Sequence, residues 1–191
     1  MKSKYYSMLF RMKYIKRWAL MRNLEAENLS EHSLETAFIA HCLAVIANKR
    51  FGENLDENKI AVAALFHDTA EVITGDLPTP VKYYNENIKS AYKSIESAAA
   101  DKLLNLLPED LKDAFIPFYQ PDEITEKYVK AADKISALIK CKEELLLGNK
   151  EFLAAAKSSE QAIIKLNLPA AKVFLKEFLP AFEQGLDENM E

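Results

Sequence analysis

Ile60-Ala-Val-Ala-Ala-Leu-Phe-His-Asp-Thr-Ala-Glu-Val-Ile73 is the stretch of sequence that decides the fold. It is apolar nearly all round at helical spacing, so it predicts a central helix whose N-cap is Asp56. Three ionisable residues interrupt it: His67, Asp68 and Glu71. On an unbroken helix Glu71 would lie one turn after the other two, so all three could face one cavity. Because uncompensated charges are rarely buried in so apolar a segment, a functional site is favoured over a salt-bridged helix end.

The segments on both sides of this stretch also have helical patterns, and none shows the alternation of a strand. Ala, Leu, Lys and Glu dominate the composition and only 4 glycines occur, which favours helix. The expected helices cover about residues 30–50 with Ser30 as N-cap, 85–107, a shorter one ending near Pro117, 123–147, and two C-terminal helices broken near Leu168–Pro169. We therefore predict an all-α fold, a single compact helical bundle over residues 1–191 with peripheral N- and C-terminal helices.

The composition is that of a globular protein with one domain, since 49% of the 191 residues are hydrophobic and 28% are charged. A net charge of −4 argues against a nucleic-acid polymer as partner, and no apolar run reaches the ~20 residues that span a bilayer. Charged residues break the apolar positions of Lys2–Arg22, which predicts an amphipathic helix docked on the core rather than a signal peptide. Cys42 and Cys141 lie in apolar helical patterns, as expected of reduced thiols in a cytoplasmic protein.

Two further candidate ligands lie far from the central stretch, His32 upstream and Asp133 downstream. A histidine near a helix N-terminus is disfavoured as a cation, so the position of His32 predicts a neutral ring able to bind a metal; a surface histidine is the alternative. Asp133 follows two alanines on a face that can pack closely and would need a partner there, unless it faces solvent and pairs with Lys130 or Lys134. His41 lies half a turn round the helix from His32 and predicts a partly buried structural residue.

The order His…His-Asp…Asp with helices between resembles the HD-domain metal-dependent phosphohydrolases over about residues 30–137. Four strings narrow the resemblance to the bacterial 5'-deoxynucleotidases of the YfbR-like subgroup: Arg17-Trp-Ala-Leu-Met-Arg-Asn23, Glu31-His-Ser33, His67-Asp-Thr-Ala-Glu71 and Gly75-Asp-Leu-Pro-Thr-Pro80. The last string is the most specific, and its prolines predict a rigid loop after a helix that ends before Gly75. Ala19 departs from the subgroup, where proline is expected.

The resemblance implies a metal site and a substrate. The implied ligands are His32, His67, Asp68 and Asp133, a mixed nitrogen and oxygen set that suits Co²⁺, Mn²⁺ or Zn²⁺ without choosing among them. The implied reaction is hydrolysis of deoxyribonucleoside 5'-monophosphates to deoxynucleoside and phosphate, with discrimination against ribonucleotides. The resemblance also suggests a homodimer, for which the apolar helices after about Glu151 could supply a face.

The resemblance also implies roles for residues around the metal. Glu71 is expected to position or deprotonate the attacking water, and Arg17 to bind the phosphate. Trp18 would orient the phosphate and pack against the sugar, and Asp68 would contact the substrate as well as the metal. Whether Asp76 donates a proton or only binds a sugar hydroxyl stays open. The loop residues expected to line the nucleotide pocket are Asp76, Leu77, Pro78 and Thr79.

Two other functions stay possible at this point. Another HD-type hydrolase would act on triphosphates, cyclic nucleotides or alarmones. Alarmone hydrolases tend to carry Glu-Asp where this chain has Glu71-Val72, and a triphosphate would need more basic residues than the chain offers. A non-catalytic helical interaction module is the second alternative, and it predicts no tightly held metal.

Overall fold

The computed structural model describes residues 2–82 and 84–190, and this part of the chain is helical, with one isolated antiparallel bridge between Lys16 and Asn28 and no strand. The predicted all-α fold is confirmed. The expected domain over residues 1–191 includes Met1, Tyr83 and Glu191, which lie outside the described residues. The α-helices are α1 (Tyr5–Leu9), α2 (Leu29–Phe51), α3 (Glu57–Phe66), α4 (Glu71–Thr74), α5 (Thr79–Lys82), α6 (Glu86–Leu104), α7 (Lys112–Tyr119), α8 (Glu123–Leu146), α9 (Leu153–Lys165), α10 (Pro169–Glu177) and α11 (Leu186–Met190). Short 3₁₀ turns are η1 (Phe10–Tyr14), η2 (Glu109–Leu111), η3 (Lys150–Phe152) and η4 (Leu179–Glu183).

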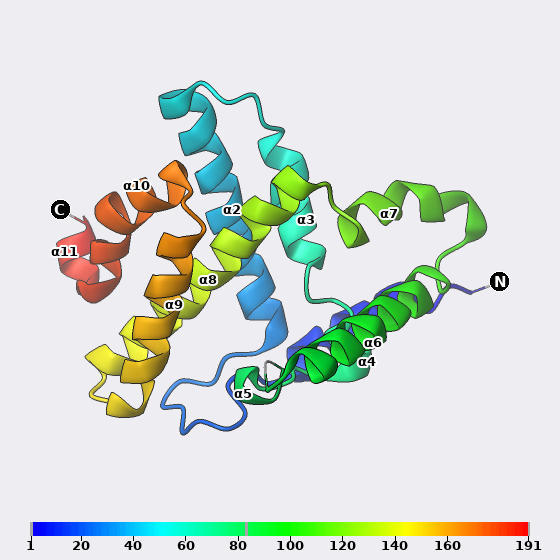
Figure 1. Ribbon diagram of the computed structural model, residues 1–191, viewed down its shortest axis with the longest axis horizontal. Coiled ribbons are helices and arrows are strands. Elements are labelled where there is room, and N and C mark those ends of the chain that lie inside the picture. The colour runs from blue at the N-terminus through cyan, green and yellow to red at the C-terminus, as the bar shows by residue number, and fades with distance from the viewer. Residues whose placement is uncertain (1, 83, 191) are drawn as a thin grey trace.

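Helices α2, α3 and α8 form the centre of the bundle, with α9, α10 and α11 on one side and α4, α6 and α7 on the other (Figure 1). Small side chains on the three central helices allow close approach, because alanines there are fully or almost fully buried. A second, smaller apolar cluster joins Tyr5 of α1 to Leu103 and Leu104 of α6. The end of α3 lies between the two clusters, since Ala64 belongs to the larger and Phe66 packs against the smaller.

The central stretch is not one helix, and this part of the prediction is wrong. Helix α3 ends at Phe66, and residues 67–70 form a turn before α4. Side chains compete for the carbonyls that would continue the helix: Nδ1 of His67 lies 2.7 Å from the Ala64 oxygen, and Thr69 Oγ1 donates to the Phe66 oxygen at 2.8 Å. The periodicity did not predict this break because the apolar composition continues across it.

Three smaller differences also have local causes. The N-cap of α2 is Asn28, not Ser30, because Asn28 Oδ1 accepts from the Ser30 and Glu31 amides while Glu31 Oε2 accepts from the Asn28 amide. The proline-rich loop contains the single turn α5, which tolerates proline in its first turn. The predicted N-terminal helix stops at α1 and η1, and residues 15–28 run without helix beyond them.

None of the helices within the described residues combines the length and apolar character needed to cross a bilayer.

Candidate active site

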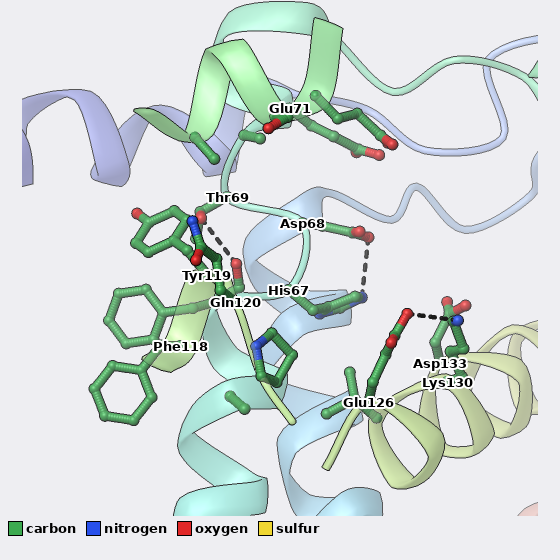
Figure 2. Close-up of a pocket in the computed structure, with 18 of the residues that line it drawn as sticks. His67, Asp68, Thr69, Glu71, Phe118, Tyr119, Gln120, Glu126, Lys130 and Asp133 are labelled. Carbon is green, nitrogen blue, oxygen red and sulfur yellow. Dashed lines mark hydrogen bonds and ion pairs between the residues drawn. The ribbon is translucent and has the colours of Figure 1, made fainter. Parts of the chain in front are cut away.

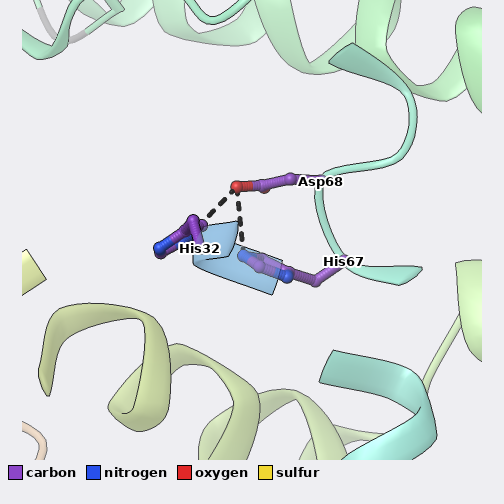
Figure 3. Close-up of side chains that lie close together, drawn as sticks. All are labelled: His32, His67 and Asp68. Atoms are coloured by element: carbon purple, nitrogen blue, oxygen red, sulfur yellow. Dashed lines mark ion pairs between the residues drawn. The ribbon is translucent and has the colours of Figure 1, made fainter. Parts of the chain in front are cut away.

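The turn between α3 and α4 brings His67 and Asp68 to face His32 in the first turns of α2 (Figure 3). One ligand atom from each of these three residues lies within 4.8 Å of the others. Asp68 Oδ2 is at the middle of the group, 3.0 Å from His67 Nε2 and 3.7 Å from His32 Nε2. The His32 side chain is fully buried, whereas the side chains of His67 and Asp68 are partly exposed. Two imidazoles and one carboxylate therefore converge as the sequence predicted.

Asp133 of α8 lies at the edge of this group. Its Oδ1 is 3.3 Å from His32 Nε2, and its Oδ2 is 2.8 Å from the Lys134 ammonium. It is outside the set whose ligand atoms all lie within 4.8 Å of one another. The structure thus brings Asp133 beside His32 and not equally close to every member of the group.

The orientation of His67 fits a bound cation. A carbonyl oxygen only accepts, so the 2.7 Å contact of Nδ1 with the Ala64 oxygen places the proton of a neutral ring on Nδ1. The Nε2 lone pair then faces Asp68 Oδ2 at 3.0 Å, and within the described residues this buried nitrogen has no hydrogen-bond partner. Two lone pairs aimed at each other repel, and a cation between them would satisfy both. A backbone carbonyl that fixes the tautomer in this way is the usual outer contact of a metal-bound histidine.

The electrostatics of the cluster also favour positive charge. Burial acts to lower the pKa of His32, but contacts with Asp133 and Glu27 outweigh it and raise that pKa to about 9. Burial acts to raise the pKa of Asp68, but the positive charges that His67 and His32 carry when they are protonated hold it below its usual range. Without a cation in the cluster these carboxylates favour the protonated ring of His32, whereas the helix N-terminus favours the neutral ring. Since a metal ligand must be neutral, cation binding would release a proton from this ring.

Arg17 and Trp18 approach the cluster from residues 15–28. Arg17 Nη1 lies 3.5 Å from Asp68 Oδ2, and its Nε lies 3.3 Å from Glu27 Oε1. Trp18 has a backbone φ of +59°, which is rare for a bulky residue, and its ring packs against Phe152. Strained residues of this kind cluster at functional sites.

Glu27 is the site residue that sequence reasoning missed. Its side chain is buried, with Oε2 accepting from Trp18 Nε1 at 2.6 Å and Oε1 lying 3.5 Å from His32 Nδ1. It belongs to an irregular segment, where a glutamate has no periodic pattern to mark it as buried. The available signal was indirect: Arg17 and the Trp18 indole are donors with no acceptor nearby in sequence, and a buried donor needs one.

Glu71 opens into a cavity of about 570 Å³ that is also lined by His67, Asp68 and Asp133 (Figure 2). Only 4% of Glu71 is exposed, and among the described residues its buried Oε2 has no hydrogen-bond partner. Burial, reinforced by the charges of Asp68 and Asp76, raises the pKa of this carboxyl group. The break at 67–70 invalidates the one-turn spacing argument for Glu71, yet its side chain shares this cavity.

The proline-rich loop lies apart from that cavity. None of Arg17, Trp18 and the four predicted loop residues, Asp76, Leu77, Pro78 and Thr79, is among its lining residues. Asp76 is partly buried, and burial raises its pKa while the Arg17 charge opposes the rise. His41 is exposed, so its predicted partial burial is wrong. Of the predicted residues, His67, Asp68, Glu71 and Asp133 therefore line the cavity, and Arg17 reaches this set through its contact with Asp68.

The chain is similar to known proteins over most of its length. A family model described as 5'-deoxynucleotidase YfbR-like matches residues 4–182. A 5'-deoxynucleotidase of Vibrio vulnificus is 49% identical over 189 residues, which cover 97% of each chain. The crystal structure of an HD-domain phosphohydrolase from Listeria innocua matches with a TM-score of 0.83 at 21% identity, over 98% of this chain and 92% of that one. An HD phosphohydrolase of cyanophage S-2L, bound to dA and one catalytic Zn²⁺, matches with a TM-score of 0.50 at 18% identity, over 83% and 96%.

Proposed function

The chain belongs to the YfbR-like family of 5'-deoxynucleotidases, and from that membership we propose that it hydrolyses deoxyribonucleoside 5'-monophosphates to deoxynucleoside and phosphate. The observation that carries the proposal is the buried Nε2 of His67, which lies 3.0 Å from Asp68 Oδ2 and has no hydrogen-bond partner among the described residues. His32 and Arg17 lie beside this pair. A cation site next to a guanidinium is suited to a phosphate ester, because both groups favour the oxygens of a phosphate.

His32, His67 and Asp68 would hold a divalent cation, and Asp133 is the fourth ligand in this proposal. Mixed nitrogen and oxygen ligation suits Co²⁺, Mn²⁺ or Zn²⁺, and Zn²⁺ is the ion bound to the cyanophage protein. When bound, the cation would neutralise phosphate charge, activate water and oppose the negative charges that raise the pKa of Glu71.

Arg17 binds the phosphate in this proposal, and Trp18 orients the phosphate and packs against the sugar. The Arg17 side chain is only 12% exposed and already reaches Asp68, so little conformational freedom is lost when it binds a phosphate oxygen. A bulky ring held against the sugar disfavours a 2'-hydroxyl, and steric rejection of this kind is worth at most about a hundredfold.

Glu71 accepts the proton of the attacking water, because its buried Oε2, which has no hydrogen-bond partner in the described part of the chain, shares the cavity with Asp68. The water oxygen forms a bond to phosphorus as the bond between phosphorus and the 5'-oxygen breaks, and the 5'-oxygen leaves as a hydroxyl after it receives a proton. Burial raises the pKa of Asp76, which supports Asp76 as that proton donor. The alternative role, binding a sugar hydroxyl, stays open for this residue, and Leu77, Pro78 and Thr79 complete the proposed nucleotide-binding loop.

The homodimer and the cytoplasmic location stay predictions. Exposed apolar side chains near the C-terminus support a dimer face: Phe178, Phe182 and Leu186 are 39%, 39% and 78% exposed. Light scattering of the purified protein would measure its oligomeric state.

Phosphate release from a nucleotide panel tests the proposed function. The panel holds dAMP, AMP, dATP and cyclic AMP, each assayed with Co²⁺, Mn²⁺, Zn²⁺ or a chelator, for the wild-type protein and the His67→Ala variant. We expect release from dAMP in excess of AMP, dependent on a divalent ion and lost in the variant. Release confined to dATP or cyclic AMP would favour another HD-type activity. No release with any ion, together with no bound metal by elemental analysis, would favour the interaction module.

A further inference from the structure

We propose that Glu27 is a positioning residue that joins the metal cluster to Trp18 and thereby sets the preference for deoxyribonucleotides. The inference rests on the proposed function, because it assigns the selectivity of that reaction to a side chain outside the reacting groups. Glu27 touches His32, Arg17 and Trp18 at once, and no other carboxylate in the described part of the chain contacts all three.

The contacts divide between the two carboxylate oxygens. Oε2 accepts a short hydrogen bond of 2.6 Å from Trp18 Nε1. Oε1 lies 3.3 Å from Arg17 Nε and 3.5 Å from His32 Nδ1. Glu27 is 8% exposed, and within residues 2–82 and 84–190 its buried Oε1 forms ion pairs but no well-directed hydrogen bond. One oxygen therefore fixes the indole, and the other lies between a phosphate-binding cation and a metal-ligand candidate.

The backbone holds Glu27 opposite Arg17. The Arg17 amide donates to the Glu27 carbonyl at 3.1 Å, and the Leu29 amide donates to the Ile15 carbonyl at 2.9 Å. These bonds flank the bridge between Lys16 and Asn28, so residues 15–17 and 27–29 run antiparallel. The carboxylate is thus presented to the two site residues by main-chain pairing, which does not depend on its side-chain contacts.

Trp18 needs such a partner because of its backbone. Its left-handed conformation is strained for a non-glycine residue, and it persists only where neighbouring contacts hold it. Asn23 Nδ2 donates to the Trp18 carbonyl at 3.3 Å, and Phe152 packs against the ring. The bond to Glu27 is the one side-chain hydrogen bond that the indole makes to described residues, so it fixes the plane of the ring that would meet the sugar.

The chemistry of the three neighbours requires a carboxylate. Trp18 and Arg17 offer only donors, and His32 offers a donor at Nδ1 once Nε2 binds a metal. A carboxylate accepts on both oxygens, whereas a glutamine in its place would turn its NH₂ group toward one of these donors. The hydrogen-bond partner of His32 Nδ1 is Ser136 Oγ at 3.1 Å, and Glu27 Oε1 lies 3.5 Å from the same nitrogen, so Glu27 acts on this ring through its charge. A metal on His32 Nε2 would leave the ring proton on Nδ1 beside that charge, which couples cation binding to the position of Glu27 and thus of Trp18.

The test compares Glu27→Gln and Glu27→Asp with the wild-type protein and with Glu35→Gln as a matched control. Glu35 lies one turn after His32 on α2 and accepts from Ser136 Oγ at 3.4 Å, and among the described residues it contacts neither Trp18 nor Arg17. Three quantities are measured: kcat/KM for dAMP and for AMP with the same ion, the affinity for Zn²⁺, and the emission of Trp18. Trp18 is the only tryptophan in the chain, so its fluorescence and its quenching by acrylamide report on this contact alone.

We expect the ratio of dAMP to AMP kcat/KM to fall roughly tenfold in Glu27→Gln, the effect of losing one hydrogen bond to a charged group. Zn²⁺ affinity should fall about 10- to 100-fold, as for the loss of an outer contact to a metal-bound histidine, and acrylamide quenching should rise. Glu27→Asp keeps the charge but shortens the reach, so it should fold, bind Zn²⁺ more tightly than the glutamine variant and still lose selectivity. Glu35→Gln keeps an oxygen that can accept from Ser136 Oγ and does not touch Trp18, so it should match the wild type in selectivity and in quenching.

A wild-type ratio and wild-type quenching in both Glu27 variants would overturn the inference. The proposed function fails separately, if the wild-type protein releases no phosphate from dAMP with any ion. In that case the Zn²⁺ and fluorescence measurements still decide whether Glu27 positions His32 and Trp18, because neither depends on turnover.

Discussion

Glu27 and Glu144 are two buried carboxylates that contact the same irregular segment, residues 15–28, and their hydrogen-bonding needs are met very differently. Glu144 accepts from the Leu24 amide at 3.0 Å, the Lys140 ammonium at 2.6 Å and Asn149 Nδ2 at 2.7 Å. Around Glu27, by contrast, the described structure leaves several buried polar atoms without hydrogen bonds, including Glu27 Oε1, His67 Nε2 and Glu71 Oε2.

The difference separates a structural cluster from a functional one. A closed polar network rigidifies a fold, whereas buried atoms left without partners cost free energy and persist where a ligand uses them. Lys140 also donates to the Glu25 carbonyl at 2.6 Å, so the Glu144 cluster closes on the segment itself. We call Glu144, Lys140 and Asn149 the closed cluster, and Glu27, His67 and Glu71 the open cluster. Variants of the closed cluster should lose stability, and variants of the open cluster should lose function.

The largest effect on activity is expected at Glu71, which belongs to the open cluster. Glu71→Ala removes the proposed general base, so kcat should fall by about 10²- to 10⁴-fold while KM changes little. Stability should hold or rise, because an unpartnered buried oxygen is removed with the side chain. Steady-state kinetics with dAMP and urea unfolding of the same preparation measure both quantities. Unchanged turnover would remove Glu71 from the mechanism.

The reverse pattern is expected at Glu144. Glu144→Ala leaves the Lys140 ammonium buried and unpaired, and breaking a buried pair in this way costs about 3–5 kcal/mol of unfolding free energy. The control is Glu177→Ala, which breaks an ion pair of two exposed groups with Arg50 and should leave the unfolding curve nearly unchanged. If Glu144→Ala instead lost activity at full stability, the division between the two clusters would be wrong.

A divalent ion should stabilise the protein by binding at His32, His67 and Asp68, and variants of the closed cluster should not affect this gain. At an ion concentration of 100 times Kd, binding adds about 2.7 kcal/mol to the unfolding free energy. We expect this gain in the wild-type protein and in Glu144→Gln, its removal by a chelator, and its absence in His67→Ala. Thermal unfolding with and without Zn²⁺, Co²⁺ or Mn²⁺ measures it. An equal gain in His67→Ala would place the ion elsewhere.

The same contrast explains which features the sequence could predict. Helix α8 was expected over about 123–147 and spans Glu123–Leu146, because its amphipathic pattern and its N-cap are local properties. The family resemblance implied that His32, His67 and Asp68 belong to one site. It rests on the order of motifs along the chain, so it could not predict the turn at 67–70. Glu27 and Glu144 were both missed as buried acids. Glu27 lies in an irregular segment, and Glu144, although it pairs with Lys140 one turn earlier on α8, is covered by the Leu24 and Glu25 amides far away in sequence. Burial of both acids therefore follows from tertiary contacts that no periodicity records.

The smallest expected effect is a change of stability with pH that arises from the ionisation of Glu144. Burial acts to raise the pKa of Glu144, but hydrogen bonds from Lys140, Asn149 and the Leu24 and Glu25 amides outweigh it and lower that pKa to about 2 from its ordinary 4.5. As the pH falls below about 4.5 the unfolded chain takes up this proton first, so the stabilisation is present above that pH and is lost progressively toward pH 2.

The difference in thermal midpoint between the wild-type protein and Glu144→Gln should therefore be greatest at neutral pH and should shrink as the pH falls from 5 to 3. Other carboxyl groups titrate in the same range, but they titrate in both proteins, and the difference isolates Glu144. Midpoint curves that stay parallel between pH 7 and pH 3 would mean that the carboxylate carries no charge-dependent stabilisation. The closed cluster would then hold residues 15–28 by packing rather than by its hydrogen bonds.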